Sequence, residues 1–117
     1  MTLQIKRAYD PPSAADGTRI LVDRLWPRGL SKEKLKLDAW MKDLAPSNEL
    51  RKEFHHDASK WQEFQRRYFK ELSQQPELVA ELRKKARRSK VTLVYGAQDE
   101  IHNNAAALKH YLESHKK

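Results

Sequence analysis

Three stretches of the chain have the hydrophobic pattern of β-strands. Residues 3–7, Leu-Gln-Ile-Lys-Arg, alternate apolar and polar positions, which is typical of a strand with one buried face. A second strand is expected over about 19–22, directly before a charged loop that contains Pro27 and Gly29. Residues 91–95, Val-Thr-Leu-Val-Tyr, are β-branched and almost uninterruptedly apolar, which predicts a central strand buried on both faces.

Between the second and third strands, apolar residues recur at helical spacing, which predicts a crossover made wholly of helices. Ser31 can cap the first of these helices and Ser47 the next, over about 48–54, because a serine hydroxyl accepts a hydrogen bond from a free amide of the first turn. The apolar positions that share helical spacing after Ser31 are Leu37, Met41 and Leu44.

The clearest helix is expected to begin near Ser59, because the run Ser59-Lys60-Trp61-Gln62 has the form of a capping box. Its apolar stripe consists of Trp61, Phe64, Tyr68 and Leu72. Helical spacing alone explains this stripe, so we interpret it as core rather than as a platform for stacked bases. Pro76 suits the first position of the following helix, and Asp99 or Asn103 can cap the last one.

This order of elements predicts one three-layer α/β domain over residues 1–117, with a small, mainly parallel sheet of about three strands flanked by five or six helices. A helical crossover between the second and third strands makes that pair parallel. The first connection is close to the minimum length of a parallel crossover and has no helical pattern. The direction of the first strand therefore stays open.

Composition narrows the class of protein further. Of the 117 residues, 38% are hydrophobic and 34% are charged, and no apolar run approaches the roughly 18–20 residues that span a bilayer. The start of the chain lacks the charged-then-apolar pattern of a secretory signal, and there is no cysteine for a disulfide or a thiolate metal site. We therefore expect a cytoplasmic protein with no membrane partner and no cofactor.

The net charge of +8 is unevenly spread, because residues 82–90 contain six cationic residues and no acidic one. Such a segment can contact nucleic-acid phosphates, and the candidate residues are Arg83, Lys84, Arg87 and Arg88. The alternative is a solvated helix face whose cations complement the carbonyl end of the helix dipole.

Candidate site residues follow the second and third strands, whose carboxyl ends meet at one edge of a parallel sheet. We expect a crevice there, joined by the free amides at the start of the last helix near Asn103 and Asn104, and by Arg7 and Tyr9 if the first strand is parallel. The residues expected to bind a ligand are Arg24, Trp26, Arg28, Gly29, Gln98, Asn103 and Asn104.

The guanidinium groups of Arg24 and Arg28 at this edge suit the oxygens of phosphate or carboxylate, so the expected ligand is a small anionic, phosphate-bearing molecule. Asp23 and Tyr95 are the candidates for acid–base catalysis, although the chain has no P-loop, nucleophile elbow or HExxH motif. The structural alternative is that Asp23 pairs with an arginine and that Trp26 fills the core.

The run His55-His56-Asp57 could in principle bind a metal ion or relay protons. Neighbouring side chains point in different directions, however, and the run has no third ligand within it. We therefore expect no metal site, and a role for His55 or His56 at the end of a helix.

Four blocks of the chain resemble the small YeaO-like bacterial family, domain of unknown function 488. They are LVDRLWPRG at 21–29, APSNELR at 45–51, WQEFQRRYFKEL at 61–72 and VTLVYGAQDEIHNNAAAL at 91–108. The resemblance implies a common fold for nearly the whole chain but brings no established activity. Two classes of function stay open: an enzyme or binder of an anionic ligand at the sheet edge, and a nucleic-acid or protein-binding module that uses the basic segment. The oligomeric state also stays open.

Overall fold

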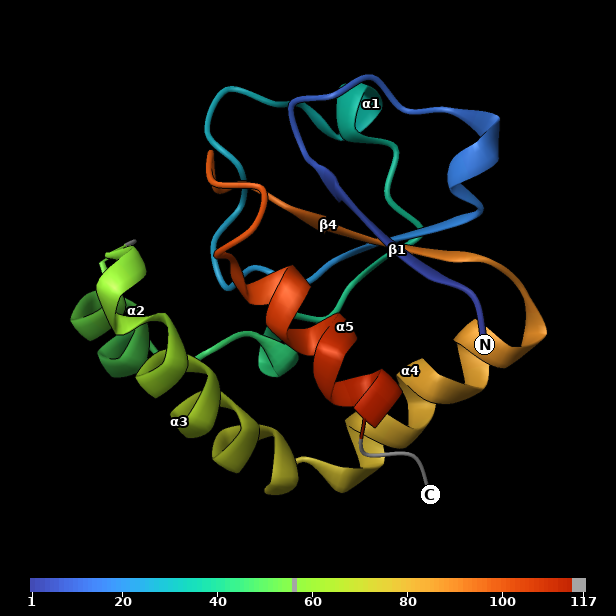
Figure 1. The fold of residues 1–117 in the computed structure, drawn as a ribbon. Helices are drawn as coiled ribbons and strands as arrows, with labels where there is room; N and C mark the ends of the chain where they lie inside the picture. The colour runs from blue at the N-terminus through green and yellow to red at the C-terminus, as the bar shows by residue number, and fades with distance from the viewer. Residues whose placement is uncertain (56, 115–117) are drawn as a thin grey trace.

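The computed structural model describes residues 1–55 and 57–114, and within them four parallel strands form one sheet at the centre of the molecule (Figure 1). The strands are β1 (Leu3–Arg7), β2 (Thr18–Leu21), β3 (Ala39–Trp40) and β4 (Val91–Tyr95). Their order is β1-β4-β2-β3, so β4 lies between two partners. This confirms the predicted α/β class and the parallel pairing of β2 with β4, and it makes β1 parallel as well.

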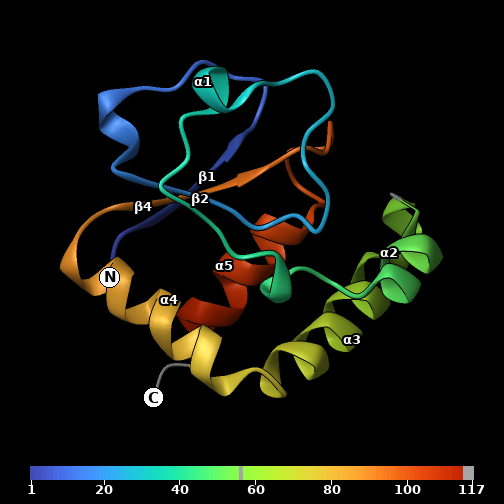
Figure 2. The same cartoon turned by 180° about the vertical axis from the view of Figure 1, so that it is seen from behind.

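Five α-helices in the described part of the chain cover the two faces of the sheet unequally. They are α1 (Lys32–Leu35), α2 (Asn48–Phe54), α3 (Trp61–Ser73), α4 (Pro76–Arg88) and α5 (Asn104–Ser114). The short α1 lies on one side, and α2 to α5 lie on the other (Figures 1 and 2). Short 3₁₀ helices at Ala14–Asp16, Lys42–Leu44 and Ala58–Lys60 complete the connections.

Strand β4 explains why both faces are covered, because its side chains alternate between two apolar clusters. Leu93 and Tyr95 belong to the larger cluster with residues of α3, α4 and α5. Val94 belongs to the smaller cluster with Leu21 and Leu35 on the α1 side. All five residues of β4 are buried, as the apolar run predicted.

The crossover from β2 to β4 is not wholly helical, which corrects the prediction for residues 37–44. Helix α1 ends at Leu35, and β3 then pairs with β2. Asp38 fixes this pairing, because its backbone N–H donates to the Arg19 carbonyl and its carboxylate accepts from the Arg19 N–H at 2.8 Å. Met41 packs in the larger cluster and Leu37 against the smaller one, so residues at helical spacing serve opposite faces of the sheet.

The start of α3 also differs from the prediction. Ser59 does not form a capping box, because the helix N-cap is Lys60, which makes no side-chain capping bond. Instead the Asp57 carboxylate accepts from the Ser59 N–H at 3.0 Å and starts the 3₁₀ turn that leads into α3. The predicted Ser47 cap of α2 is confirmed, since its hydroxyl accepts from the Leu50 N–H at 3.1 Å.

The α1 side of the sheet holds a buried ionic network. Arg19 and Asp16 are only 4% and 3% exposed, and the Arg19 Nη1 lies 2.7 Å from the Asp16 carboxylate. Lys6 on β1 lies 3.1 Å from the same carboxylate. The remaining Arg19 nitrogens donate to backbone carbonyls, including that of Leu35 at 2.7 Å from Nη2. The network therefore ties β1, β2 and the end of α1 together.

Candidate functional site

The segments that follow β2 and β4 meet at the carboxyl edge of the sheet, as their parallel arrangement predicts. The Asp23 carboxylate joins them, because Oδ2 accepts from the Gly96 N–H at 2.8 Å and Oδ1 accepts from the Asn104 side-chain amide at 3.0 Å. The same Asn104 amide also donates to the Val22 carbonyl at 2.8 Å. Asp23 thus fixes the loop after β2 to the loop after β4 and to the first residue of α5.

A cavity of about 220 Å³ opens beside these contacts. Its polar lining consists of Asp23, Arg24, Arg51, Asn103 and Asn104, together with the backbone of Gly96 and Ala97. Three of the seven residues that the sequence predicted to bind a ligand, Arg24, Asn103 and Asn104, therefore line one cavity together with the catalytic candidate Asp23.

Aromatic and aliphatic side chains form the other wall of this cavity. Phe54 at the end of α2 and Phe64 on α3 are 5% and 3% exposed, and their rings stack with centroids 4.5 Å apart. Leu25 and Pro46 complete the apolar lining. The cavity therefore combines charged and apolar surfaces, as sites for small organic ligands commonly do.

Arg24 is held in place by the chain that leads into α2. Its Nε donates to the Pro46 carbonyl and its Nη2 to the Ala45 carbonyl, both at 3.1 Å. A second cavity lies on the far side of Arg24, beside Tyr68 and Glu71. Burial, and then the nearby Asp23 and Glu71 carboxylates, raises the pKa of Tyr68, whose hydroxyl donates to the Leu44 carbonyl. Arg24 is thus a fixed positive charge between two cavities.

Arg51 is the lining residue that sequence reasoning missed. It lies on α2 one turn before Phe54, so both side chains reach the cavity. Its Nη2 donates to Asn48 at 3.0 Å, whereas its Nε is buried and has no hydrogen-bond partner among the residues that the structure describes. The available signal was an arginine at the edge of an apolar helix face, between Leu50 and Phe54, but that position alone is also typical of a surface residue.

The loop after β4 is stabilised by two side chains that the sequence offered as alternative caps. The side-chain oxygen Oδ1 of Asn103 accepts from the Ala106 N–H at 2.8 Å and caps α5. The Asp99 carboxylate accepts from the N–H groups of His102 and Ile101, and these bonds lower the pKa of Asp99 to about 2. Both predicted caps are therefore used, one for the helix and one for the turn before it.

The structure does not bring the other predicted residues to this cavity. Arg28, Gly29 and Gln98 are exposed, and none of them lines it. Trp26 packs on the α1 side, where its ring meets Trp40 edge-on at 5.5 Å and its Nε1 donates to the Leu30 carbonyl. Trp26 therefore fills the smaller core, in line with the structural alternative for this residue.

Tyr95, the second catalytic candidate, is 1% exposed and belongs to the larger core. Burial, and then the negative charge of Glu100, raises the pKa of Tyr95, so its hydroxyl stays neutral at ordinary pH. The two residues expected to join the edge from β1 do lie there: the Arg7 Nε donates to the Ala97 carbonyl, and the Tyr9 hydroxyl donates to the Arg28 carbonyl. Both support loops rather than line the cavity.

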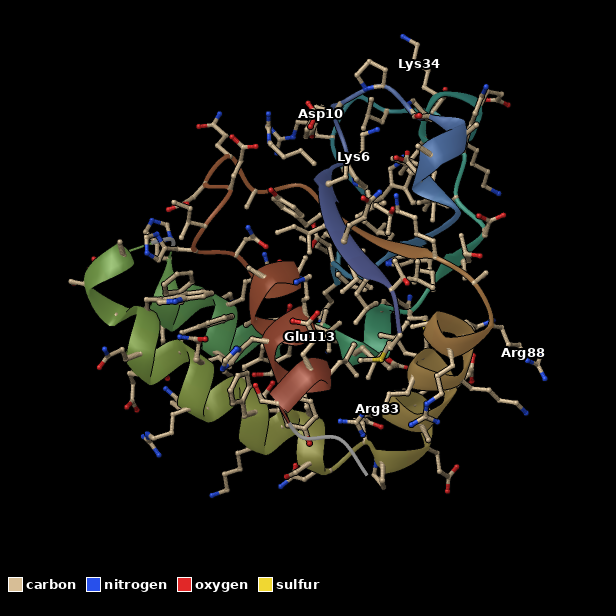
Figure 3. The ribbon with its side chains drawn as sticks, turned by 45° about the vertical axis from the view of Figure 1, so that its right-hand side comes forward. Lys6, Asp10, Lys34, Arg83, Arg88 and Glu113 are labelled. Carbon is tan, nitrogen blue, oxygen red and sulfur yellow. The ribbon has the colours of Figure 1, made fainter. Side chains whose placement is uncertain are left out.

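The basic segment lies on α4 and differs from the charged surface of α3. Lys84, Arg87 and Arg88 are exposed, and none forms an ion pair with any described residue. Arg83 is half-buried, with its guanidinium 6.0 Å from the centroid of the Tyr111 ring. On α3, by contrast, Arg66 and Arg67 pair with Glu63 and Glu53. Figure 3 shows the Arg88 side chain extending away from the end of α4.

The histidine run has a structural role where it is described. His55 ends α2 in a left-handed conformation with φ of 43°, and its N–H donates to the Arg51 carbonyl, as expected of a helix-end residue. His56 lies outside the described residues. Within 1–55 and 57–114, no three histidine or carboxylate side chains are grouped closely enough to hold a metal ion. In the same ranges no helix has the length and apolarity needed to cross a membrane.

Comparison with known proteins shows the family. Residues 2–117 match the family described as "Inactive DUF488-N3 subclade". The chain is 44% identical over 114 residues to the uncharacterized protein YeaO of Escherichia coli (strain K12), covering 97% of this chain and 99% of the relative. It is 41% identical over 110 residues to the uncharacterized proteins Mb3100c of Mycobacterium bovis and Rv3073c of Mycobacterium tuberculosis, covering 94% of this chain and 92% of each relative.

No solved structure matches the chain at a significant level. The family match and the identity to YeaO nonetheless extend over nearly the full length, so the chain belongs to the YeaO-like DUF488 family. This confirms the resemblance seen in the sequence blocks.

Proposed function

We propose that this member of the YeaO-like DUF488 family binds a small anionic ligand in the cavity at the carboxyl edge of the sheet. The observation that carries the proposal is the state of Arg51, a cavity-lining arginine whose buried Nε lacks a hydrogen-bond partner among the described residues. An unpaired buried donor costs about 1–3 kcal/mol. A ligand oxygen that draws the guanidinium toward the cavity would give this N–H an acceptor and remove that cost.

Arg24 supports the same site from the opposite loop. Its guanidinium is fixed by the carbonyls of Ala45 and Pro46, so its charge is already in place before a ligand arrives. Asn103 and Asn104 lie on the same lining, but their side-chain amides already donate to Asp99, Val22 and Asp23, so the two arginines supply the donors for a ligand in this proposal. The positively charged side chain expected from the sequence at Arg28 is thus supplied, in this proposal, by Arg51.

The proposed role is binding without turnover. Both Asp23 oxygens are occupied by the Gly96 N–H and the Asn104 amide, which suits a structural carboxylate more than a proton carrier. Tyr95, the other acid–base candidate, is buried in the core and does not line the cavity, so it does not reach a ligand there. The word "Inactive" in the family description fits this reading. Since the chain has no cysteine, a reducing bacterial cytoplasm is the proposed location.

Thermal unfolding in the presence of anions tests the proposal. We expect inorganic phosphate, acetate or benzoate to raise the melting temperature, since a ligand at 100 times its Kd stabilises the folded state by about 2.7 kcal/mol. Arg51→Met should abolish the shift, and Arg28→Ala, which removes an equal charge from an exposed loop, should keep it. An unchanged shift in Arg51→Met, or no shift with any of the three anions, would overturn the proposal.

A second candidate function is contact with nucleic-acid phosphates through α4. The observation that favours it is the contrast between helices: the exposed cations Lys84, Arg87 and Arg88 form no ion pair with described residues, whereas the α3 arginines do. Uncompensated cations on one helix face suit a polyanion. This face lies on α4, outside the cavity lining, so the two candidate functions are separable by mutation.

Salt-dependent binding to a generic duplex DNA and a single-stranded RNA tests the second candidate. We expect the double variant Arg87→Gln/Arg88→Gln to weaken binding and to reduce the slope of log K against log salt by about 2, one unit for each lost phosphate contact. The matched control Arg66→Gln/Arg67→Gln removes the same charge from α3. Equal effects of the two double variants would mean that only net charge matters, and the candidate would fail.

A further inference from the structure

We infer, building on the proposed anion site, that the ligand is a small monocarboxylate with a flat apolar body rather than a phosphate dianion. The cavity has two charged guanidinium groups, Arg24 and Arg51, and one carboxylate, Asp23. Its other lining residues are neutral, so the lining carries one net positive charge. A monoanion neutralises this charge.

A dianion would bring one more negative charge than the lining can neutralise and would place it beside the Asp23 carboxylate. Asp23 accepts hydrogen bonds through both oxygens and holds the loops after β2 and β4 together, so it cannot turn away from a ligand without losing those bonds. Two negative groups that share a partly buried site repel each other, which disfavours the more highly charged ligand. The fixed carboxylate thus acts as a filter on ligand charge.

Arg24 further limits how much negative charge the cavity can neutralise. Its Nε and Nη2 are already bonded to the carbonyls of Pro46 and Ala45. The side of the Arg24 guanidinium formed by Nε and Nη2 therefore serves the fold, and Arg51, whose Nε has no partner among the described residues, is left as the principal fork for a ligand. One fork matches the two oxygens of one carboxylate, which is the geometry that arginine binds best.

The apolar wall of the cavity determines the uncharged part of the ligand. Phe54 and Phe64, whose rings stack on each other at 4.5 Å, form an aromatic part of the cavity wall, and Leu25 and Pro46 extend the apolar surface. Inorganic phosphate would leave this surface facing water, whereas a planar hydrocarbon would cover it and gain from the area removed from water. The cavity volume of about 220 Å³ is below the usual range of about 300–1,000 Å³ for drug-sized ligands, so the body must be small.

Calorimetric titration with four probe ligands tests separately whether binding requires a negative charge, an apolar ring and a single rather than a double charge. Benzoate has one carboxylate on a flat ring, benzamide has the ring without the charge, acetate has the charge without the ring, and phenyl phosphate has the ring with a second charge. At pH 7.5 we expect benzoate to bind at least about tenfold more tightly than each of the other three. Arg51→Met should weaken benzoate by a similar factor, and Arg28→Ala should leave it unchanged.

The outcomes distinguish this inference from the proposed function on which it rests. Tighter Arg51-dependent binding of phenyl phosphate than of benzoate would overturn the monocarboxylate inference and leave the anion site standing. Equal Arg51-dependent binding of acetate and benzoate would exclude the apolar body in the same way. Equal binding of benzamide and benzoate, insensitive to Arg51→Met, would overturn both.

Discussion

Arg19 on β2 and Arg51 on α2 are both arginines with buried guanidinium nitrogens, yet their surroundings differ. Each nitrogen of the Arg19 guanidinium has an acceptor, with Asp16 at 2.7 Å from Nη1 and backbone carbonyls for Nε and Nη2. Arg51 donates to Asn48 through Nη2, and its buried Nε has no partner among the described residues. Arg19 lies under α1, and Arg51 lines a cavity.

The difference teaches that burial of a charge does not by itself indicate a site. Arg19 is the more deeply buried, but each of its three guanidinium nitrogens donates a hydrogen bond that holds β2 to neighbouring segments. Arg51 lines a cavity, and its Nε donor is unused among the residues that the structure describes. Unused hydrogen-bonding capacity next to a cavity, rather than burial, is therefore the criterion by which we propose Arg51 and not Arg19 as a ligand-binding residue.

The largest effect should come from breaking the Arg19 network. Arg19→Met removes the main partner of the buried Asp16 carboxylate, and loss of one member of a buried ion pair typically costs about 3–5 kcal/mol. Urea unfolding monitored by tryptophan fluorescence measures this change. The control is Arg66→Met, whose solvent-exposed pair with Glu63 is screened by water and should contribute little to stability. Similar losses in the two variants would contradict the structural role of Arg19.

Low pH should also reduce the stability that the network of Asp16 and Arg19 contributes. Burial raises the pKa of Asp16, but hydrogen bonds from the Ser13 N–H, Lys6 and Arg19 outweigh it, so its pKa lies below the ordinary value of 3.8. A lowered pKa means that the carboxylate contributes stability above that ordinary value and loses it as the pH falls through the folded-state pKa. We expect the free energy of unfolding to drop below about pH 4. The drop should be smaller in Asp16→Asn, and an equal drop would contradict the prediction.

Substitutions at the cavity should lower the free energy of unfolding by less than Arg19→Met does, and the largest of these losses is expected at Asp23. Asp23→Ala leaves the Gly96 N–H without its acceptor and releases one bond of the Asn104 amide. An unsatisfied donor in a partly buried place costs about 1–3 kcal/mol. Chemical unfolding measures the loss, and hydrogen exchange of the Gly96 amide should speed up. Full stability in Asp23→Ala would show that the carboxylate does not join the two loops.

Asn103 sharpens the comparison because it both lines the cavity and caps α5. Asn103→Ala removes the acceptor of the Ala106 N–H and should cost about 1 kcal/mol, the usual worth of an N-cap. Asn103→Asp keeps the capping oxygen and should recover most of the loss. Measured by thermal and urea unfolding, a deficit in Asn103→Asp as large as that in Asn103→Ala would exclude the capping role.

The smallest effects on stability should come from Arg51 and Arg28. Arg51→Met removes the buried Nε donor, which has no partner among the described residues, and also breaks the Nη2 bond to Asn48. These effects have opposite signs, so we expect a net change within about 0.5 kcal/mol, unlike the loss in Arg19→Met. Arg28→Ala should stay within the same limit, because its side chain is exposed and only its backbone carbonyl accepts the Tyr9 hydroxyl. Equilibrium unfolding checks both. A loss in Arg51→Met near that of Arg19→Met would erase the contrast between the two arginines.

Much of the fold could be predicted from local pattern. The alternation at β1 and the apolar run at β4 identified both strands, and the stripe of Phe64, Tyr68 and Leu72 identified the buried face of α3. These signals are reliable because the side-chain periods of a strand and a helix are properties of the backbone itself. The edge where β2 and β4 end could be predicted for the same reason, once their crossover implied parallel strands.

Other features depend on partners far away in the chain. The two-residue strand β3 forms because Asp38 exchanges hydrogen bonds with Arg19, and no local pattern in residues 37–44 records that pairing. The same holds for the start of α3, where Asp57 rather than Ser59 accepts the first hydrogen bond. Short elements gain little from propensity, so tertiary contacts decide them.

The residues of the candidate site also divide into those that local sequence pattern could place and those that depend on tertiary contacts. Asp23 and Arg24, together with Asn103 and Asn104, could be placed at the cavity from sequence because they directly follow strands or begin a helix on one edge. Arg51 could not, because α2 is separated from both strands and only its packing against α3 turns Arg51 and Phe54 toward that edge. The sequence by itself determined which backbone ends meet. Only the tertiary structure decided which arginine, Arg51 rather than Arg28, lies beside them with a donor that no described residue uses, because hydrogen-bond satisfaction depends on every neighbour in space.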